Sequence, residues 1–248
     1  MRGVIALLAL VLAGEPLAAC GSGASSTHTS ASGAQSGAAA STRQLTRRQA
    51  LAFANAVNLT ASDVPPFTAS SQNESSSRSE QQAERQLRRC AGPVASSRGL
   101  AEVSSKNFQL KRDVLQLGVS SEVDVASSSA QAAKNLAAIR SAHVRSCFSR
   151  YLEELFKGPQ FAGGAVSPVS IESGTPPAPG TTGSFGWRAI AAFTVQGITV
   201  HLYLDMLGFV DGPAQVTLFS SGVLRPFPAA VQERLFSLLL VRAKAHRL

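Results

Sequence analysis

Residues 187–220, WRAIAAFTVQGITVHLYLDMLGFVDGPAQVTLFS, hold the pattern that decides the fold. Three runs rich in apolar and β-branched residues are separated by two short polar–glycine steps, QG at 196–197 and DG near 211–212. A polar residue followed by glycine is typical of the tight turns of β-hairpins. The stretch therefore predicts an antiparallel meander of three strands, over residues 187–195, 198–207 and 214–220.

A further strand is expected upstream, over residues 114–125, where apolar and polar residues alternate. Such alternation places successive side chains on opposite faces of a strand. Shorter strands are expected over 101–110, joined to 114–125 by a turn at 111–113, and over 165–171, which Pro168 keeps near a sheet edge. The expected sheet thus has about six strands. One face of 114–125 carries Leu115, Leu117, Val119, Val123 and Val125, and the other carries Gln116, Ser120, Glu122 and Asp124.

Helices are expected before, between and after these strands. The first begins after Thr46, because Thr46 and Gln49 have the spacing of a capping box, and it ends at Asn58. The others are expected over residues 79–91 and 127–156, and after Pro228. Runs of hairpin-linked strands with few crossovers favour a mostly antiparallel sheet flanked by helices. The predicted fold is α+β, as a single globular domain over residues 45–248.

The N-terminal region has the features of an export signal. A positive charge at Arg2 precedes an apolar run over residues 4–13, which has the length of a signal-peptide core and is too short to span a bilayer. The following Leu17-Ala18-Ala19-Cys20 resembles the bacterial lipobox, in which the cysteine receives a diacylglyceryl group and the signal is cut before it. The resemblance implies a signal peptide over 1–19 and a lipidated Cys20. The alternative is a plain secreted protein with a coincidental cysteine.

Between this signal and the domain, residues 21–42 are almost entirely Gly, Ala, Ser and Thr. Such a segment cannot bury enough apolar surface to fold, so residues 20–44 are expected to form a tether with a reach of about 25 Å. The formal net charge of the chain is +8. The basic residues are scattered and rarely interleaved with aromatic ones, which argues against nucleic acid and favours anionic lipid headgroups or acidic wall polymers.

The sequence contains three cysteines. If Cys20 carries lipid, Cys90 and Cys147 remain as an even pair in an oxidising compartment. Each falls on the expected buried face of its helix, Cys90 after Ala83 and Leu87, and Cys147 in a stripe that includes Ala133 and Ala137. A disulfide between them is therefore expected, and it would stabilise the fold by about 4 kcal/mol in the chain-entropy model. The alternative is a pair of free thiols or half of a metal site.

No sequence motif of a nucleophile, metal cluster or phosphate-binding loop stands out in this chain, and no catalytic residue, metal or cofactor is expected. The one polar constellation is His201, Tyr203 and Asp205, which alternate along one expected strand and so share a face. They are interpreted as a possible ligand groove between sheet and helix. The alternative is a solvated or hydrogen-bonded face of the sheet.

Several stretches together resemble actinobacterial cell-envelope lipoproteins. They are the lipobox and tether, the run 58–65 (NLTASDVP), the pair Cys90 and Cys147, and the run 209–218 (FVDGPAQVTL) followed by an amphipathic helix. The expected domain is similar to PsbP-like domains and to the extracytoplasmic sensor domains of mycobacterial Ser/Thr kinases. The resemblance implies an antiparallel sheet flanked by helices and a non-catalytic role, and it carries over no functional residues.

Three functions are compatible with these features. The first is a lipid-anchored module outside the cytoplasmic membrane that binds or senses a lipid, a glycan or a protein, with no nucleic-acid partner. The second is a cell-envelope hydrolase that uses His201 and Asp205. The third is a structural or assembly protein of the envelope that acts through an edge of its sheet.

Overall fold

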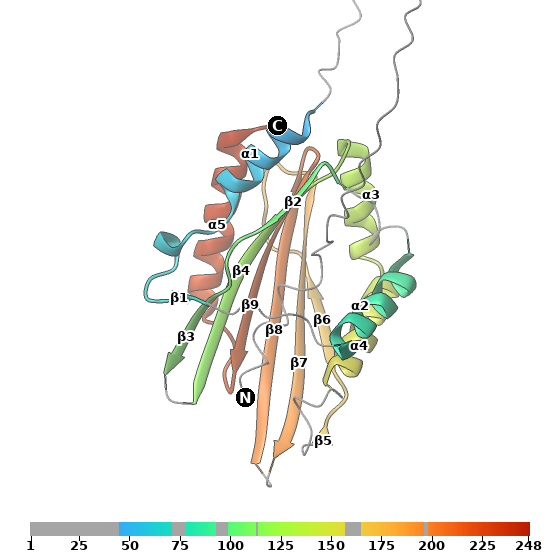
Figure 1. Cartoon of the computed structure of the whole chain (residues 1–248), viewed down its shortest axis with the longest axis vertical. Coiled ribbons are helices and arrows are strands. Elements are labelled where there is room, and N and C mark those ends of the chain that lie inside the picture. Colours follow the sequence, from blue (N-terminus) through green and yellow to red (C-terminus); the bar gives the residue numbers. More distant parts are fainter. Residues whose placement is uncertain (1–44, 71–77, 93–98, 113, 157–164, 196–197) are drawn as a thin grey trace, which may run out of the picture.

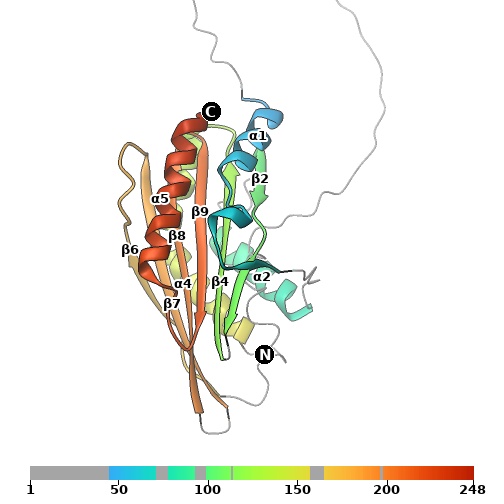
Figure 2. The same cartoon turned by 90° about the vertical axis from the view of Figure 1, so that its left-hand side faces the viewer.

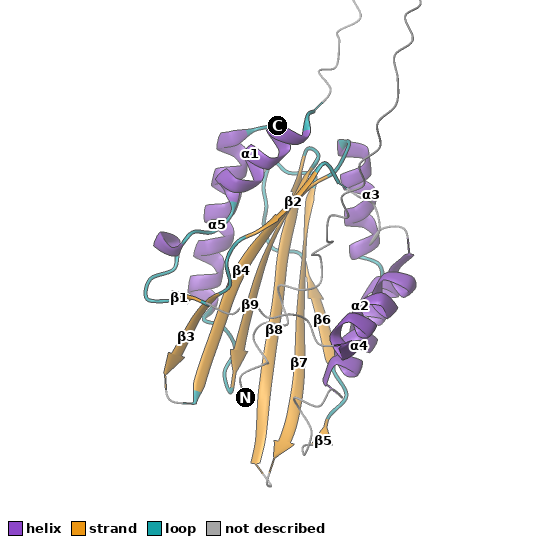
Figure 3. Cartoon of the chain, in the orientation of Figure 1, coloured by secondary structure: helices purple, strands orange, loops and turns teal. Residues whose placement is uncertain are grey.

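The computed structural model describes residues 45–70, 78–92, 99–112, 114–156, 165–195 and 198–248 (Figure 1). The expected signal peptide, Cys20 and the tether lie outside these residues. The described part is an α+β fold in which helices flank an antiparallel sheet, as the sequence predicted (Figure 3). The helices are α1 (Arg47–Val57), the short η2 (Ala61–Asp63), α2 (Arg78–Ala91), α3 (Ser129–Ile139), α4 (Ala142–Phe156) and α5 (Ala229–His246). The strands are β1 (Thr68–Ala69), β2 (Ala101–Ser104), β3 (Phe108–Arg112), β4 (Leu115–Val125), β5 (Ala165–Val166), β6 (Ser170–Gly174), β7 (Gly183–Val195), β8 (Ile198–Asp211) and β9 (Ala214–Val223).

The described sheet has nine strands in the order β1-β3-β4-β9-β8-β7-β5, while β2 also pairs with β4 and β6 with β7. The predicted meander forms its centre. Strand β7 pairs with β8 along its whole length, and β8 pairs with β9 from Leu202↔Val223 to Asp211↔Ala214. The end of the β7–β8 hairpin therefore extends beyond β9, as Figure 2 shows.

The strand number differs from the expected six because two expected strands are each divided in two. The segment 101–110 becomes β2 and β3, which both pair with β4, and the segment 165–171 becomes β5 and β6, which both pair with β7. The two-residue β1 adds the ninth strand. The expected turn at 111–113 is also displaced, because Lys111 and Arg112 still pair with Gln116 and Leu115.

One face of the sheet is covered by α1 and α5. Alternate residues of β4, β8 and β9, including Val119, Phe209 and Leu218, pack there against buried residues of the two helices. The rings of Phe209 and Phe236 meet edge to face at 5.5 Å between centroids. The predicted cap of α1 is confirmed, since Gln49 N donates to Thr46 Oγ1 and Thr46 N donates to Gln49 Oε1.

The opposite face is covered by α2, α3 and α4, which Figure 1 shows grouped away from α1 and α5. Here residues of β7 and β8, among them Ala189, Leu202 and Leu204, pack against Cys147 and Tyr151 of α4. A smaller cluster joins Phe185 and Val210 to α3. The central strands are therefore covered on both faces, which explains why Ser120, Glu122 and Thr217 are buried although they are polar.

The prediction of one long helix over 127–156 is wrong in one respect. The segment forms two helices, α3 and α4, which are separated at Arg140 and Ser141. Arg140 ends α3, and its guanidinium donates to the carbonyl oxygen of Ser184 in β7. The break changes the phase of the apolar stripe. As a result Ala132 and Leu136 are buried in α3, and the predicted Ala133 and Ala137 are not.

Candidate functional site

The three side chains singled out on β8 share one face of the sheet. Leu202 and Leu204, which alternate with them, belong to the opposite face and are buried in the cluster around α4. His201 is exposed and Tyr203 is half-buried, and their ring centroids lie 6.2 Å apart. Asp205, in contrast, is only 3% exposed. The alternation of side chains along β8 thus places the three residues on one face, but their burial increases from His201 to Asp205.

Asp205 is held by Arg188, which lies directly opposite it on β7. Nε of Arg188 donates to Oδ1 of Asp205 at 2.6 Å, and Nη2 donates to Oδ2 at 3.1 Å. This bidentate pairing is the strong geometry for a guanidinium and a carboxylate, and the hydrogen bonds that Arg188 donates to Asp205 raise the pKa of Arg188. Because both carboxylate oxygens bind Arg188, Asp205 anchors that guanidinium and does not orient His201.

We call His201, Tyr203, Arg188 and Asp205 the β8 polar face. It lies on the same side of the sheet as α5, which covers β8 at Phe209 but leaves His201 exposed. An imidazole, a phenol and a fixed guanidinium offer donors, acceptors and aromatic surface side by side. Such a mixture suits recognition of a polar ligand with hydroxyl or anionic groups.

A second polar cluster, which sequence reasoning missed, lies on the opposite face of the sheet. It consists of Glu102 on β2, and Glu122 and Asp124 on β4. Glu102 lies directly opposite Asp124, and Ser104 lies opposite Glu122, to which its hydroxyl donates at 3.0 Å. Glu122 is only 4% exposed. The alternation of β4 correctly placed Glu122 and Asp124 on one face, but it gave no sign that this face would be covered.

Burial and mutual repulsion make these carboxyl groups weak acids. Burial, reinforced by the charges of Asp124 and Glu102, raises the pKa of Glu122 well above its usual range. Burial raises the pKa of Asp124 to about 6. Partial desolvation and the charge of Asp124 raise the pKa of Glu102 to about 7, although Glu102 is exposed as a whole residue. The three carboxyl groups therefore keep their protons to higher pH than exposed carboxyl groups do, and their ionisation as pH rises disfavours the folded state.

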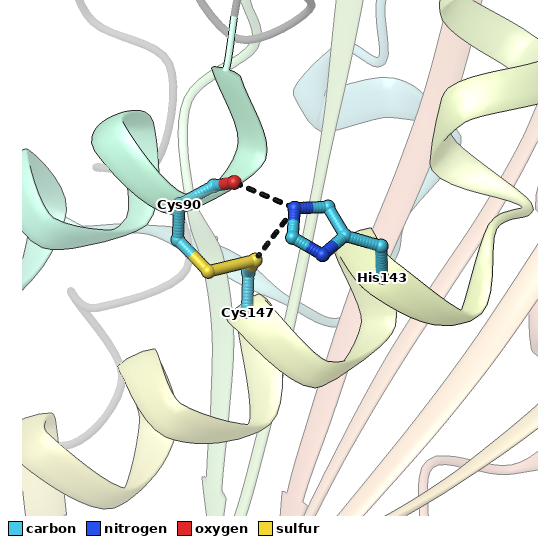
Figure 4. A group of neighbouring side chains, drawn as sticks. All are labelled: Cys90, His143 and Cys147. Carbon is cyan, nitrogen blue, oxygen red and sulfur yellow. Dashed lines mark hydrogen bonds between the residues drawn. A yellow bond between two sulfur atoms is a disulfide. The ribbon is translucent and has the colours of Figure 1, made fainter.

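The predicted disulfide between Cys90 and Cys147 is present and joins α2 to α4, with their Cα atoms 5.7 Å apart (Figure 4). His143 lies one helical turn before Cys147, and its Nε2 contacts the carbonyl oxygen of Cys90 at 2.8 Å. His143 is exposed, but Nε2 of its ring also lies 3.7 Å from the sulfur of Cys147. Arg150 approaches from the other side, and its Nη2 lies 3.3 Å from the sulfur of Cys90.

His143 is also the ligand partner that the sequence did not reveal for the cysteine pair. Its ring and the two sulfurs offer three ligand atoms within 4.8 Å of one another. Because the two sulfurs are bonded to each other, they serve the disulfide and not a metal ion. With the disulfide formed, the three residues link α2 to α4.

Comparisons with family models, with curated proteins and with solved structures find no match to this chain. Among the described helices, none combines the length and the apolar character that crossing a membrane requires.

Proposed function

We propose that this chain is a lipid-anchored envelope protein, held by an acylated Cys20 at the outer face of the cytoplasmic membrane, which binds or senses a partner. The observation that carries the proposal is the disulfide between Cys90 and Cys147. A persistent disulfide is typical of proteins outside the cytoplasm. It also leaves Cys20, in its lipobox-like setting, as the remaining cysteine of the three in the sequence.

The relation to PsbP-like domains and to extracytoplasmic kinase-sensor domains is part of the same proposal. It is supported by the antiparallel sheet flanked by helices, which is the fold that the resemblance implies. A shared fold does not define a ligand, because function depends on the residues of the site.

The β8 polar face is the surface that best suits this role. His201 is exposed and Tyr203 is half-buried, while the Arg188–Asp205 pair lies next to Tyr203 along the same face of β7 and β8. A glycan or a lipid headgroup fits these groups better than a purely apolar ligand does. The pairing of Asp205 with Arg188 favours binding over acid–base catalysis, because a hydrolytic His201 would need a free carboxylate to orient it.

Mass spectrometry of the full chain extracted from membranes tests this binding role. We expect a co-purified envelope lipid or glycan that is lost when His201 and Tyr203 are both replaced by alanine. The matched control replaces Lys111 and Arg112, two exposed residues at the end of β3, and should keep the ligand. If both variants retain the ligand equally, the β8 polar face is not the binding surface. A hydrolytic activity abolished by His201→Ala would replace binding with catalysis, and a cross-linked protein at the sheet edge would favour an assembly role.

A further inference from the structure

Unpaired positive charges gather at the end of the molecule where the tether joins the domain. Arg47 and Arg48 open α1, two residues after the first described residue, and Arg247 follows the last turn of α5. Both cartoon views place the start of α1 and the C-terminus at the same end of the molecule (Figures 1 and 2). We call Arg47, Arg48 and Arg247 the basic end.

The three arginines of the basic end are not used to hold the fold together. All three are exposed, and none forms a hydrogen bond or ion pair with any residue that the structure describes. Other cations of the same helices behave differently. Arg242 is paired with Asp63 at 2.7 Å, and Lys244 donates to the carbonyl oxygen of Pro179 at 2.6 Å.

Local helix energetics do not explain Arg47 and Arg48 either. The N-terminus of a helix carries a partial positive charge, so cations in the first turn are unfavourable and acidic residues are preferred there. Helix α1 has two arginines in this turn and no acidic residue. Neither contacts within the described chain nor the helix dipole therefore account for the positions of Arg47 and Arg48.

The two helices that carry the basic end hold little negative charge near it. Helix α1 contains no Asp or Glu, and α5 contains none after Glu233. Asp63, which approaches α5, has both carboxylate oxygens bound by Arg242. Apolar side chains are exposed nearby, Val241 on α5 at 64% and Leu248 after the helix at 40%. Cations beside exposed apolar groups suit a lipid surface better than a fully hydrated acidic polymer.

We propose that the basic end docks on anionic phospholipid headgroups and thereby orients the domain on its own membrane, with the β7–β8 hairpin pointing away. The proposal rests on the lipid anchor proposed above, since that anchor brings this end near the bilayer. The contact is electrostatic, weak and reversible, because single cations near a charged bilayer each strengthen binding about fivefold. Anchoring by acyl chains and orientation by arginines are then separate functions.

Vesicle binding by the full chain carrying Cys20→Ser tests the docking without any contribution from acylation. Vesicles of phosphatidylglycerol and phosphatidylcholine are compared with vesicles of phosphatidylcholine alone. The test variant is Arg47→Gln with Arg48→Gln. The matched control is Lys111→Gln with Arg112→Gln, which removes the same charge from exposed positions at the β3–β4 turn, at the other end of the sheet in Figure 1. Any binding by the signal segment is common to all variants.

We expect the Arg47/Arg48 variant to bind anionic vesicles about thirtyfold more weakly, while the control changes by less than about twofold. The difference should shrink as salt rises from low to high concentration. The melting temperature of the Arg47/Arg48 variant should equal or exceed that of the parent, because the change removes charges that oppose the helix dipole. A lower melting temperature together with unchanged vesicle binding would assign these arginines a structural role and overturn the proposal.

Equal losses in both variants would also overturn the proposal, because net charge alone would then account for binding. Competition by soluble poly-glutamate as effective as that by anionic vesicles would assign the basic end to an acidic polymer instead. The proposed acylation of Cys20 is tested by a separate measurement in cells. If Cys20 is not acylated in cells but the vesicle difference persists, the proposed function fails and the docking surface stands.

Discussion

Gly208 of β8 lies directly opposite Phe185 of β7, and a β-carbon at Gly208 would lie 2.2 Å from Cζ of the Phe185 ring. Phe185 is 1% exposed and packs in the cluster that joins β7 and β8 to α3. The ring therefore occupies the space that a side chain at position 208 would need. A glycine at position 208 therefore leaves room for the Phe185 ring, which packs with residues of α3.

Replacing Gly208 by alanine should therefore destabilise the fold. Because the ring is buried and cannot move into solvent, the expected loss is about 3 kcal/mol of unfolding free energy, measured by chemical denaturation. Gly174→Ala in β6 is the control, since a β-carbon there meets no atom within 4 Å. Equal stability of the two variants would contradict the close packing of the Phe185 ring against Gly208.

Loss of the disulfide should be equally visible. Replacing Cys90 and Cys147 by serine should lower the unfolding free energy by about 4 kcal/mol, since the bridge restricts a loop with a sequence separation of 57. Thermal unfolding with and without a reductant measures it. The reductant should reproduce the loss in the parent and leave the double variant unchanged. If the reductant does not change the thermal unfolding of the parent, the disulfide is not formed.

The acidic cluster of β2 and β4 should make stability fall as pH rises. An acid with a higher pKa in the folded than in the unfolded state binds more protons when folded, so stability declines between the two values. For Asp124 this window runs from 3.8 to about 6. Asp124→Asn should flatten this slope and raise unfolding free energy above pH 6 by about 3 kcal/mol. Chemical denaturation at pH 5 and pH 7 measures it, and an unchanged slope would contradict the burial of Asp124.

Asp63 should show the opposite dependence. Burial alone would raise its pKa, but hydrogen bonds from Arg242 and Thr60 outweigh burial and leave the pKa below the usual 3.8. Its contribution is therefore present above pH 4 and lost as pH falls further. Asp63→Asn should cost about 2 kcal/mol at pH 7 and much less at pH 3. The two pH values are compared by thermal unfolding, and a loss equal at both would show that the Arg242 pair contributes nothing.

The features that the sequence predicted correctly depend on neighbours along the chain. The cap formed by Thr46 and Gln49 needs a spacing of three residues, and the meander needs only its two turns. Even the Arg188–Asp205 pair could have been found, because the turn at 196–197 sets the register that brings them opposite. Cys90 and Cys147 were paired correctly because both lie on inward faces of helices.

The features that were missed depend on tertiary packing. Glu122 was expected on the polar face of its strand, and it is buried because helices cover both faces of the central sheet. The contact of His143 with Cys90 needs the packing of α2 against α4, which no local pattern encodes. Arg140, at the break between α3 and α4, donates to the carbonyl oxygen of Ser184 on β7, which is far away in sequence.

The central claim, that Cys20 anchors the protein through acyl chains, is tested most directly by mass spectrometry of the mature N-terminal peptide from the membrane fraction of cells that express the full chain. We expect a peptide that begins at Cys20 and carries a diacylglyceryl group, with labelled palmitate incorporated in the parent and absent from the Cys20→Ser variant. An unmodified N-terminus in the soluble fraction, or a signal cut at another residue, would contradict it.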